Sequence, residues 1–295
     1  MLTKTMYLYT ETPLHAGAGS GLSSIDLPIQ RERATQYPMI QGSGIKGKLR
    51  ATLEGNPAIS EDMINIVFGP LSTSGAGSDH AGALIAGDAR LLLFPVRSLN
   101  GVFAYTTSYD VLSRFRRDIE RIEAVDTLDW TVPDAVSDKA LVTTKSDVHY
   151  NNAIVLEELS FVTESNKEVD KIARWLATNA LPNMGAYWTN KLQTSLVILP
   201  NDVFRDFALY ATEIITRVRI DPKKKTVVGG ALWTEEHLPT DTLLYVPLYA
   251  NKSRKEGLNK TEEEVLAQIV ALNGKHIQLG GDETVGRGLV RIRLS

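Results

Sequence analysis

The chain has 295 residues, of which 43% are hydrophobic and 23% charged, with a net charge of -3 and no cysteine. These proportions are ordinary for a soluble globular protein, and the length allows one large domain or two modest ones. The lack of cysteine excludes disulfides, thiolate metal sites and cysteine nucleophiles. The slightly acidic balance argues against a free-standing nucleic-acid binder, but it leaves room for a local basic stripe.

Nothing in the sequence indicates a membrane segment or an export signal. No apolar run approaches the roughly 18 residues that a membrane span needs. The first residues, MLTKTMYLYTETPLH, lack the long apolar core and the small-residue cleavage site of a signal peptide. We therefore expect a cytoplasmic protein that does not enter a membrane.

The N-terminal part predicts a strand, a long loop and a helix. Leu2–Thr10 is rich in Tyr and Thr, which favours a strand. Residues 15–41 form a long irregular stretch, and a loop of this length in a globular chain is usually functional or mobile. Ser43 is a candidate N-cap for a helix that runs to about Leu53, with Gly55 as a plausible stop.

The next part predicts a short helix, an insertion and a strand. Ser60 is a candidate N-cap for a helix that ends near Phe68. Residues 71–81 are poor in apolar side chains and rich in Ser and Gly, which indicates a flexible insertion. Residues 82–98 are mostly apolar and predict a central strand closed by Pro95.

The second half predicts three helices among several strands. Thr261 and Glu264 have the spacing of a capping box, and Gly274 follows as a stop signal. We expect helices over 109–125, 167–178 and 261–272, short strands within 141–161, and strands over 213–220, 242–249, 275–279 and 289–294. This pattern predicts an α+β fold, with helices on one face of a mainly antiparallel sheet.

Two glycine-rich segments with basic residues lie at opposite ends of the chain, GSGIKGKLR at 42–50 and GGDETVGRG at 280–288. Glycine lets a backbone turn with positive φ or approach a ligand closely. Lysine and arginine beside such a backbone favour an anionic ligand. Together the two segments suggest one site for an anion, a polyanion track, that the fold assembles.

The first segment also matches two nucleotide-binding patterns. Residues 42–48 read as G-x-x-x-x-G-K, but Leu49 stands where a phosphate-binding loop needs Ser or Thr for magnesium. Gly42, Gly44 and Gly47 read as G-x-G-x-x-G, yet the preceding stretch is short and contains Pro38, so it lacks the firm strand that a dinucleotide site requires. What both patterns share is a helix start with basic side chains nearby, which favours an anion.

A set of ordered motifs resembles a known family. The motifs are HAGAGSG from His15, IDLPIQRE around Asp26, PMIQGSGIKGKLR, FGP, GDARLLLFPV, LWTEEHLPTDTLLY and the closing GGDETVGRGLVRIR. They resemble the repeat-associated mysterious protein (RAMP) superfamily of CRISPR systems. Within it they resemble the family of the fourth Cmr subunit, which forms the backbone of type III-B effector complexes. The likeness runs from about Met6 to Arg293.

The resemblance implies a fold and an activity. It implies a single RAMP domain over 1–295, with a ferredoxin-like (RRM-like) palm at about 1–100 and 190–295. An inserted finger or helical region would lie at about 101–190, and a β-hairpin thumb at about 221–236. Copies of the chain would stack along a CRISPR guide RNA beside other Cmr subunits and cut paired target RNA at regular intervals, with Mg²⁺ or another divalent cation.

By the same resemblance, Asp26 is the expected catalytic and metal-binding residue. A metal-bound carboxylate can activate water or a ribose 2′-hydroxyl, although substrate phosphates would have to complete a magnesium shell. Taken alone, a loop aspartate is most often a turn or capping residue. His15 is either a general acid or base or a histidine hydrogen-bonded to the early loop. Glu235 and Glu236 are further catalytic candidates, and since neighbouring strand residues face opposite ways, at most one should reach the site.

The remaining candidates are RNA contacts. Trp233 is either a packed anchor or a stacking platform for a base. Three lysines form a basic tip that serves solubility or meets phosphates. Arg291 and Arg293 alternate with apolar residues, so one strand face is basic. The expected RNA-binding residues are Gly42, Ser43, Gly44, Lys46, Lys48, Arg50, Lys223, Lys224, Lys225, Trp233, Gly280, Gly281, Gly286, Arg287 and Gly288.

Two other functions remain open at this stage. One is a structural RNA-binding scaffold without activity of its own, and the match at Asp26 favours the enzyme over it. The other is an NTPase, which Leu49 disfavours.

For the nuclease, the expected cut is attack of a ribose 2′-hydroxyl on the adjacent phosphate, so a DNA target, which lacks that hydroxyl, should resist cleavage.

Overall fold

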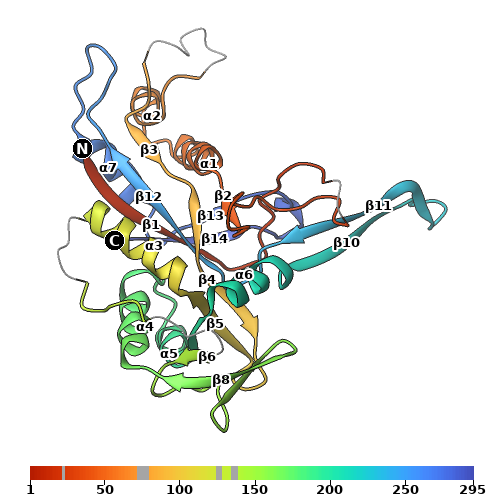
Figure 1. The fold of residues 1–295 in the computed structure, drawn as a ribbon. Helices are drawn as coiled ribbons and strands as arrows, with labels where there is room; N and C mark the ends of the chain where they lie inside the picture. Colours follow the sequence, from red (N-terminus) through yellow and green to blue (C-terminus); the bar gives the residue numbers. More distant parts are fainter. Residues whose placement is uncertain (22–23, 72–79, 124–127, 134–138) are drawn as a thin grey trace.

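The computed structural model describes residues 1–21, 24–71, 80–123, 128–133 and 139–295. Most strands belong to one large mixed sheet, and two strands form a separate hairpin (Figure 1). The elements are β1 Leu2–Thr10, β2 Met39–Ile40, α1 Gly42–Glu54, α2 Glu61–Phe68, β3 Leu84–Ala86, β4 Ala89–Arg97, β5 Phe103–Ser108, α3 Tyr109–Glu123, β6 Lys139–Val142, β7 Ala153–Leu156, β8 Leu159–Ser165, α4 Lys167–Asn179, α5 Ala186–Ser195, β9 Leu196–Leu199, α6 Asn201–Tyr210, β10 Glu213–Ile220, β11 Val227–His237, β12 Leu243–Ala250, α7 Glu262–Val270, β13 His276–Gln278, the 3-10 turn Glu283–Val285 and β14 Leu289–Leu294. The predicted α+β class is confirmed.

The chain ends meet in one half of the large sheet. Its strands run in the order β13-β14-β1-β12-β4, and each neighbouring pair is antiparallel. On one face, the rings of Tyr7 and Tyr245 pack edge-on against Phe115 of α3. Figure 1 shows α3 in front of these strands and α7 behind them. The half-sheet is therefore covered by helices on both faces, rather than on one face as predicted.

The middle of the chain builds the other half of the sheet. Its strands follow the order β5-β9-β6-β8-β7, with parallel pairs β5–β9 and β6–β8. The described part of 101–190, expected as an inserted helical region, therefore includes β5, β6, β7 and β8 as well as helices. The sequence analysis did not predict β5, α5, β9 or α6, because their short apolar runs carry no clear period.

The predicted strand over 82–98 is two strands, and Pro95 lies inside the second. Leu93 of β4 still pairs with β12, whereas Pro95 pairs only with Tyr105 of β5. Proline lacks an N–H to donate, so it is tolerated where a strand has a neighbour on one side only. The predicted insertion at 71–81 falls mostly on residues 72–79, which lie outside the described residues.

Helix boundaries follow local capping chemistry, with one correction. Ser60 caps α2 by accepting from the N–H of Met63, as predicted. Ser43 does not cap α1, because the helix already begins at Gly42 and Gln41 is its N-cap residue, without a side-chain cap bond. The helix starts two residues earlier than a cap at Ser43 would place it, and Ser43 is an exposed residue of its first turn.

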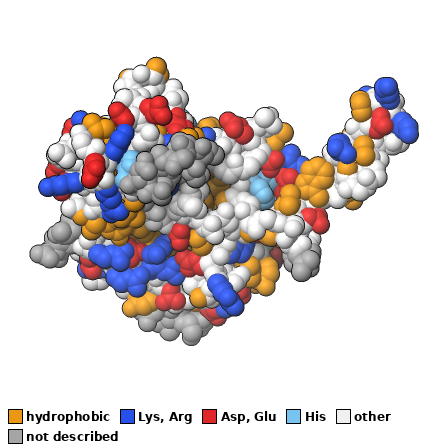
Figure 2. All heavy atoms as spheres, turned by 90° about the horizontal axis from the view of Figure 1, so that it is seen from above, with side chains coloured by type: hydrophobic (Ala, Val, Ile, Leu, Met, Phe, Trp, Pro, Cys, Tyr) orange, Lys and Arg blue, Asp and Glu red, His pale blue; other side chains and the backbone are white. Residues whose placement is uncertain are grey.

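β10 and β11 form a two-stranded ribbon that projects from the body of the molecule (Figures 1 and 2). The predicted thumb, 221–236, covers the turn and most of the second strand but omits the first strand, which begins at Glu213. Glu213 pairs with His237, so the hairpin spans Glu213 to His237.

In the described part of the chain, each helix is too short or too polar to cross a lipid bilayer.

The capping box at α7 is confirmed, and it supports a stability prediction. The Thr261 hydroxyl accepts from the N–H of Glu264, while the Glu264 carboxylate accepts from the N–H of Thr261. We expect Thr261→Ala to lower the free energy of unfolding by about 1 kcal/mol, measured by urea denaturation. Thr178→Ala is the control, because that exposed hydroxyl bonds only a carbonyl within its own helix; it should change stability by less than about 0.5 kcal/mol. Equal losses would contradict the capping role.

Candidate active site

Asp26 lies in the early loop, docked against the root of the hairpin. Its Oδ2 accepts hydrogen bonds from the Thr234 backbone N–H at 2.8 Å and from the Thr234 hydroxyl at 2.9 Å. The Asp26 N–H donates to the same hydroxyl oxygen at 3.0 Å, and the N–H of Leu27 donates to the Thr234 carbonyl. The loop therefore runs alongside β11 here, with an exposed carboxylate at the junction.

These hydrogen bonds set the charge of Asp26. Donation from the backbone N–H of Thr234, and then from its hydroxyl, lowers the pKa of the Asp26 carboxyl below its usual value. The group is therefore ionised well below neutral pH. An ionised carboxylate that faces solvent is suited to bind a cation and is too weak a base to take a proton from a hydroxyl near pH 7.

His15 is anchored to the same strand. Its Nδ1 lies 2.7 Å from the backbone carbonyl oxygen of Glu236. A carbonyl oxygen only accepts, so Nδ1 carries the proton and Nε2 of the neutral ring keeps a lone pair. Glu236 and Thr234 are two residues apart on β11, so the anchors of His15 and Asp26 are about 7 Å apart.

Glu236 shares the strand face of Thr234, but both its oxygens are engaged. Oε2 accepts from the N–H of Ile29, and Oε1 accepts from the Thr212 hydroxyl and pairs with Arg31. The side chain is buried. These contacts tie the early loop to the start of the hairpin, which is a structural role.

Glu235 faces the opposite side of β11, and its oxygens are also engaged. Oε1 accepts from the indole N–H of Trp233 at 2.7 Å, and Oε2 pairs with the Arg217 guanidinium at 2.8 Å. As expected from strand geometry, the two glutamates point to opposite faces. The sequence did not indicate that both glutamates are buried, or that their carboxylate oxygens are all paired within the protein.

Glu235 also belongs to a second group of possible metal ligands. Glu235, His237 and Asp282 each offer one possible ligand atom, and these three atoms lie within 4.8 Å of one another. However, the Arg217 guanidinium bridges Glu235 and Asp282, at 2.8 and 2.9 Å, so a cation already balances these carboxylates. Burial lowers the pKa of His237, which keeps its ring neutral. The group therefore fits a buried ion-pair cluster better than a metal site.

A divalent cation fits the donor at Asp26, though incompletely. A carboxylate oxygen is the hard ligand that Mg²⁺ prefers. Among the described residues, Asp26 belongs to no group of three or more such ligands, so the chain does not complete a metal shell there by itself. Waters and RNA phosphates would have to supply the others.

The first glycine segment forms the opening of α1, with no preceding phosphate-binding loop. Residues 42–48 are all helical, and Leu49 is fully buried in the core, so the nucleotide-binding patterns have no structural counterpart. Gly42 must be glycine, because a Cβ would lie 2.5 Å from the carbonyl oxygen of Ala86. Gly44 and Gly47 are exposed, and a Cβ there would meet no protein atom closer than 3.8 Å.

The basic residues of α1 divide into two kinds. Arg50 is engaged within the protein, by Glu54, by the carbonyl of Gly69 and by the Asn65 side chain. Lys46 has no carboxylate partner among the described residues; burial and the positive charges of Arg254 and Arg50 lower its pKa. An unpaired lysine among other cations is suited to a phosphate. Lys48 is half-buried on the same helix.

Gln30 links this helix to the early loop. Its carbonyl oxygen accepts from the N–H of Gln41 at the start of α1, and its amide donates to the carbonyl of Gly17, two residues after His15. The first glycine segment is thereby held next to the loop that carries His15 and Asp26.

The second glycine loop packs directly on His15. The N–H of Gly281 donates to the His15 carbonyl, and a Cβ at Gly280 would lie 2.2 Å from that oxygen. Gly288 has positive φ, and a Cβ there would lie 1.9 Å from the Leu279 carbonyl oxygen. Gly286 also has positive φ but faces open space, and Arg287 is half-buried.

The remaining predicted contacts lie along the hairpin. Lys223, Lys224 and Lys225 are exposed at its tip, where the Asp221 carboxylate accepts from two backbone N–H groups of the turn. This tip is at the far end of the hairpin from Asp26. Trp233 lies nearer the root, bonded to Glu235 as described above.

The fold thus gathers Asp26, His15, both glutamates and the second glycine loop at the hairpin root. Three residues that organise the hairpin root were not predicted from the sequence: Thr234, Arg31 and Arg217. Thr234 lies in the LWTEEHLPTDT motif and Arg31 in IDLPIQRE, so the motifs held them. Their partners become visible only when the loop and the hairpin meet.

Comparison with known proteins identifies the class. The profile of the RAMP superfamily matches residues 7–291, nearly the whole chain. The CRISPR system Cmr endoribonuclease Cmr4 of Pyrococcus furiosus is 39% identical over 97% of this chain and 94% of its own length. The CRISPR system CMR subunit Cmr4 of Saccharolobus solfataricus is 26% identical over 98% of this chain and 96% of its own. The chain therefore belongs to the RAMP superfamily and, within it, to the Cmr4 family.

Solved structures agree. The crystal structure of oligomeric Cmr4 from Pyrococcus furiosus superposes with a TM-score of 0.77 at 32% identity, covering 100% of this chain and 98% of that one. The family resemblance inferred from the sequence motifs is confirmed.

The second glycine loop generates a prediction with a matched control. Gly286→Ala should cost about 1 kcal/mol of stability, because its positive φ strains a side chain that otherwise meets open space. Gly288→Ala adds a collision with the Leu279 carbonyl and should cost about 3 kcal/mol in total. Thermal and urea unfolding of the two variants check this. Equal losses would contradict the steric role of Gly288.

Thr234 generates a second prediction. Thr234→Val removes the hydroxyl donor to Asp26 and leaves the backbone donor, so the pKa of Asp26 should rise toward its ordinary value. A carbon-detected NMR titration of the Asp26 carboxyl measures it. Thr216→Val, at the paired position on β10, is the control and should leave the Asp26 titration unchanged.

Proposed function

We propose that this chain is the target-cleaving backbone subunit of a type III-B CRISPR (Cmr) effector complex that acts in the cytoplasm. It would bind a guide RNA together with other copies of itself and other Cmr subunits, and cut RNA paired to the guide. The family membership supports this role, as do two relatives, one of which is named an endoribonuclease and the other a CMR subunit. The observation that carries the enzymatic part is the exposed, ionised carboxylate of Asp26, fixed at the root of a projecting hairpin.

The strand order supports the palm-and-thumb description. β14-β1-β12-β4, with α1 between β1 and β4 and α7 between β12 and β14, is the order of a ferredoxin-like βαββαβ unit. We assign this unit as the palm and the ribbon β10–β11 as the thumb. The thumb then begins at Glu213, eight residues before the start that the sequence suggested.

The arrangement suggests how the residues divide the work. Asp26 would hold a divalent cation, which would polarise the scissile phosphate and stabilise developing negative charge. His15 offers a lone pair on Nε2, suited to accept a proton from a ribose 2′-hydroxyl. Glu236 and Gln30 would keep the loop in place. Lys46, Lys48 and the exposed glycines of α1 would meet the guide backbone.

The scaffold alternative rests on one specific observation. Both glutamates near Asp26 are fully paired within the protein, so a lone aspartate remains to hold a cation. A subunit that holds RNA without cutting it would have the same fold and the same basic surfaces. The next experiment separates the two functions.

We expect Asp26→Ala to reduce target-RNA cleavage by about a hundredfold or more in the assembled complex with guide RNA and Mg²⁺, while target binding persists. Gel analysis of labelled target RNA measures the cleavage, and wild type should give regularly spaced products that chelation of the metal abolishes. Asp129→Asn, an exposed carboxylate on the middle segment, is the control and should cut normally. Unchanged products in Asp26→Ala would leave the chain as a scaffold.

Gly47 offers a test of RNA approach. A glycine inside a helix costs up to about 1 kcal/mol relative to alanine, and no protein atom forbids a Cβ here. We expect Gly47→Ala to stabilise the free protein and to weaken guide-RNA binding, because the added methyl group blocks the close approach of a phosphodiester backbone. Unfolding and filter-binding assays measure both. Gly55→Ala, just beyond the helix, should leave RNA binding unchanged; tighter or equal binding by Gly47→Ala would refute the contact.

A further inference from the structure

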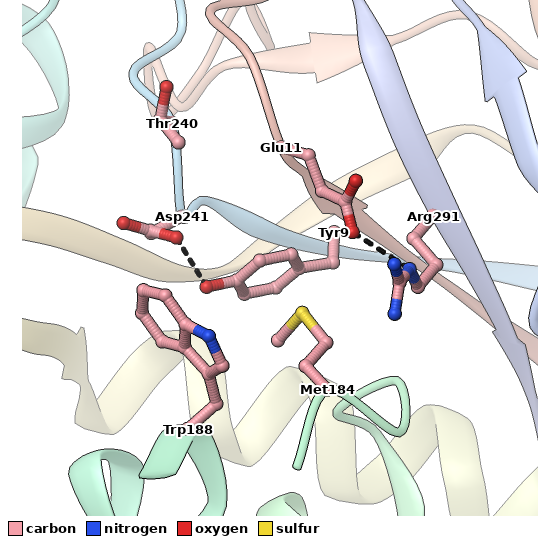
Figure 3. A pocket seen from close by; sticks show the side chains of 7 residues that line it. All are labelled: Tyr9, Glu11, Met184, Trp188, Thr240, Asp241 and Arg291. Carbon is pink, nitrogen blue, oxygen red and sulfur yellow. Dashed lines mark hydrogen bonds and ion pairs between the residues drawn. The ribbon is translucent and has the colours of Figure 1, made fainter.

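A pocket of about 350 Å³ opens beside the ends of β1 and β14, and Asp26 is not among the residues that line it (Figure 3). Two aromatic rings and a thioether form its apolar wall, and two carboxylates and a guanidinium form its polar parts. The lining residues are Tyr9, Glu11, Met184, Trp188, Thr240, Asp241 and Arg291.

Asp241 is held rigidly at the pocket in an unusual conformation. Its φ of 69° lies in the left-handed region, which non-glycine residues seldom adopt. The turn that carries it is fixed from both sides, because the hydroxyls of Thr10 and Thr242 donate to the Pro239 carbonyl. Strain of this kind persists only where surrounding contacts enforce it, and it often marks a functional position.

A chain of hydrogen bonds orients the Asp241 carboxylate. The Tyr9 hydroxyl donates to Oδ1 at 2.5 Å, so the nearby Tyr105 hydroxyl, at 2.9 Å, donates to Tyr9. Both tyrosines are buried. Oδ2 has no hydrogen-bond partner among the described residues, and Figure 3 shows it turned away from Tyr9. The pocket therefore presents one oriented, unused acceptor.

The apolar wall is a surface for a flat group. The indole of Trp188 stands edge-on to Tyr9, with ring centroids 6.5 Å apart, and Met184 lies on the same side of the pocket. At the other end, Glu11 and Arg291 form an ion pair of 2.7 Å. Aromatic faces of this kind stack nucleobases regardless of sequence.

The pocket adjoins the second glycine loop. Arg291 follows Gly288 by three residues, and the N–H of Glu11 donates to the Leu289 carbonyl at the loop's end. Arg291 is the arginine among the residues that line the pocket, and it is paired with Glu11. A phosphate attached to a bound ligand would therefore lie on the Arg291 side of the pocket.

We propose that this pocket holds a single unpaired RNA nucleobase that carries an exocyclic amino group. The base would stack on Trp188, its amino group would donate to Oδ2 of Asp241, and its phosphate would lie toward Arg291. Adenine, cytosine and guanine have such a donor and uracil does not. The inference rests on the proposed function for the presence of RNA, but it does not depend on cleavage.

The test compares short RNAs on the intact purified chain by fluorescence anisotropy. Hexacytidylate and hexauridylate are the probes, since the two pyrimidines are alike in size and differ in the group offered to Asp241. We expect wild type to bind hexacytidylate about tenfold more tightly, which corresponds to about 1.4 kcal/mol.

Asp241→Asn is the decisive variant. Its amide oxygen can still accept from Tyr9, which turns the NH₂ group toward the base, so the preference should reverse in favour of hexauridylate. Trp188→Leu should weaken both probes by about tenfold and keep their order. Thermal unfolding confirms that each variant is folded. A reversal requires a folded pocket, so loss of structure cannot imitate it.

Three results would overturn the proposal. Wild type binding both probes equally, or Asp241→Asn keeping the wild-type order, would show that Asp241 does not read a base. Competition by arginine methyl ester would show that the pocket holds a cationic side chain of a protein. A separate outcome concerns the proposed function alone. If Asp26→Ala cuts target RNA normally while the probe preference persists, the proposed nuclease activity is wrong and the proposed base-binding pocket is unaffected.

Discussion

The candidate site depends on the contacts that the buried carboxylate of Glu236 makes. This carboxylate receives an ion pair from Arg31 and hydrogen bonds from Ile29 and Thr212, and so it joins the early loop to both strands at the hairpin root. Removing one partner of a buried ion pair typically costs about 3–5 kcal/mol, because the other charge stays buried and unpaired. In its described residues the loop that carries Asp26 forms only isolated β-bridges, so its position depends on side-chain contacts such as this joint.

Glycine serves two different purposes in this chain, and the structure separates them. Gly42, Gly280 and Gly288 face backbone oxygens so closely that a side chain cannot enter. Gly44 and Gly47 face outward, where a side chain would meet nothing of the protein close by. In the first group, Gly280 lets the second glycine loop pack against His15, Gly42 lets the start of α1 pack against β3, and Gly288 lets the loop close on Leu279. The second group leaves helix α1 smooth on its exposed side. Both groups look the same in the sequence, because spacing alone does not reveal which neighbour a glycine has.

Features set by local chemistry were predictable from the sequence. The capping box at Thr261 and the strand pair before and after the second glycine loop depend on residues close in the chain, and both are found. The family motifs correctly indicated the class. The roles of Glu235 and Glu236 were not predictable, since burial and pairing depend on Arg217 and Arg31, which the fold brings from elsewhere. Arg50 likewise reads as an RNA contact until α2 is placed beside it.

The strands of the hairpin have consequences for the unassembled subunit. A lone two-stranded ribbon is marginally stable in water, and this one exposes Val218 and Leu232 on one face, with 45% and 63% of their surface open to solvent. Beyond the root, where Leu27 pairs with β11, the ribbon has no third strand among the described residues, and such open edges are a template for pairing with another strand. The lysines at the tip oppose such pairing by charge repulsion. The same few side chains of the hairpin therefore determine both the solubility of the free chain and its association with a partner. A substitution that makes the hairpin more soluble will tend to weaken that association.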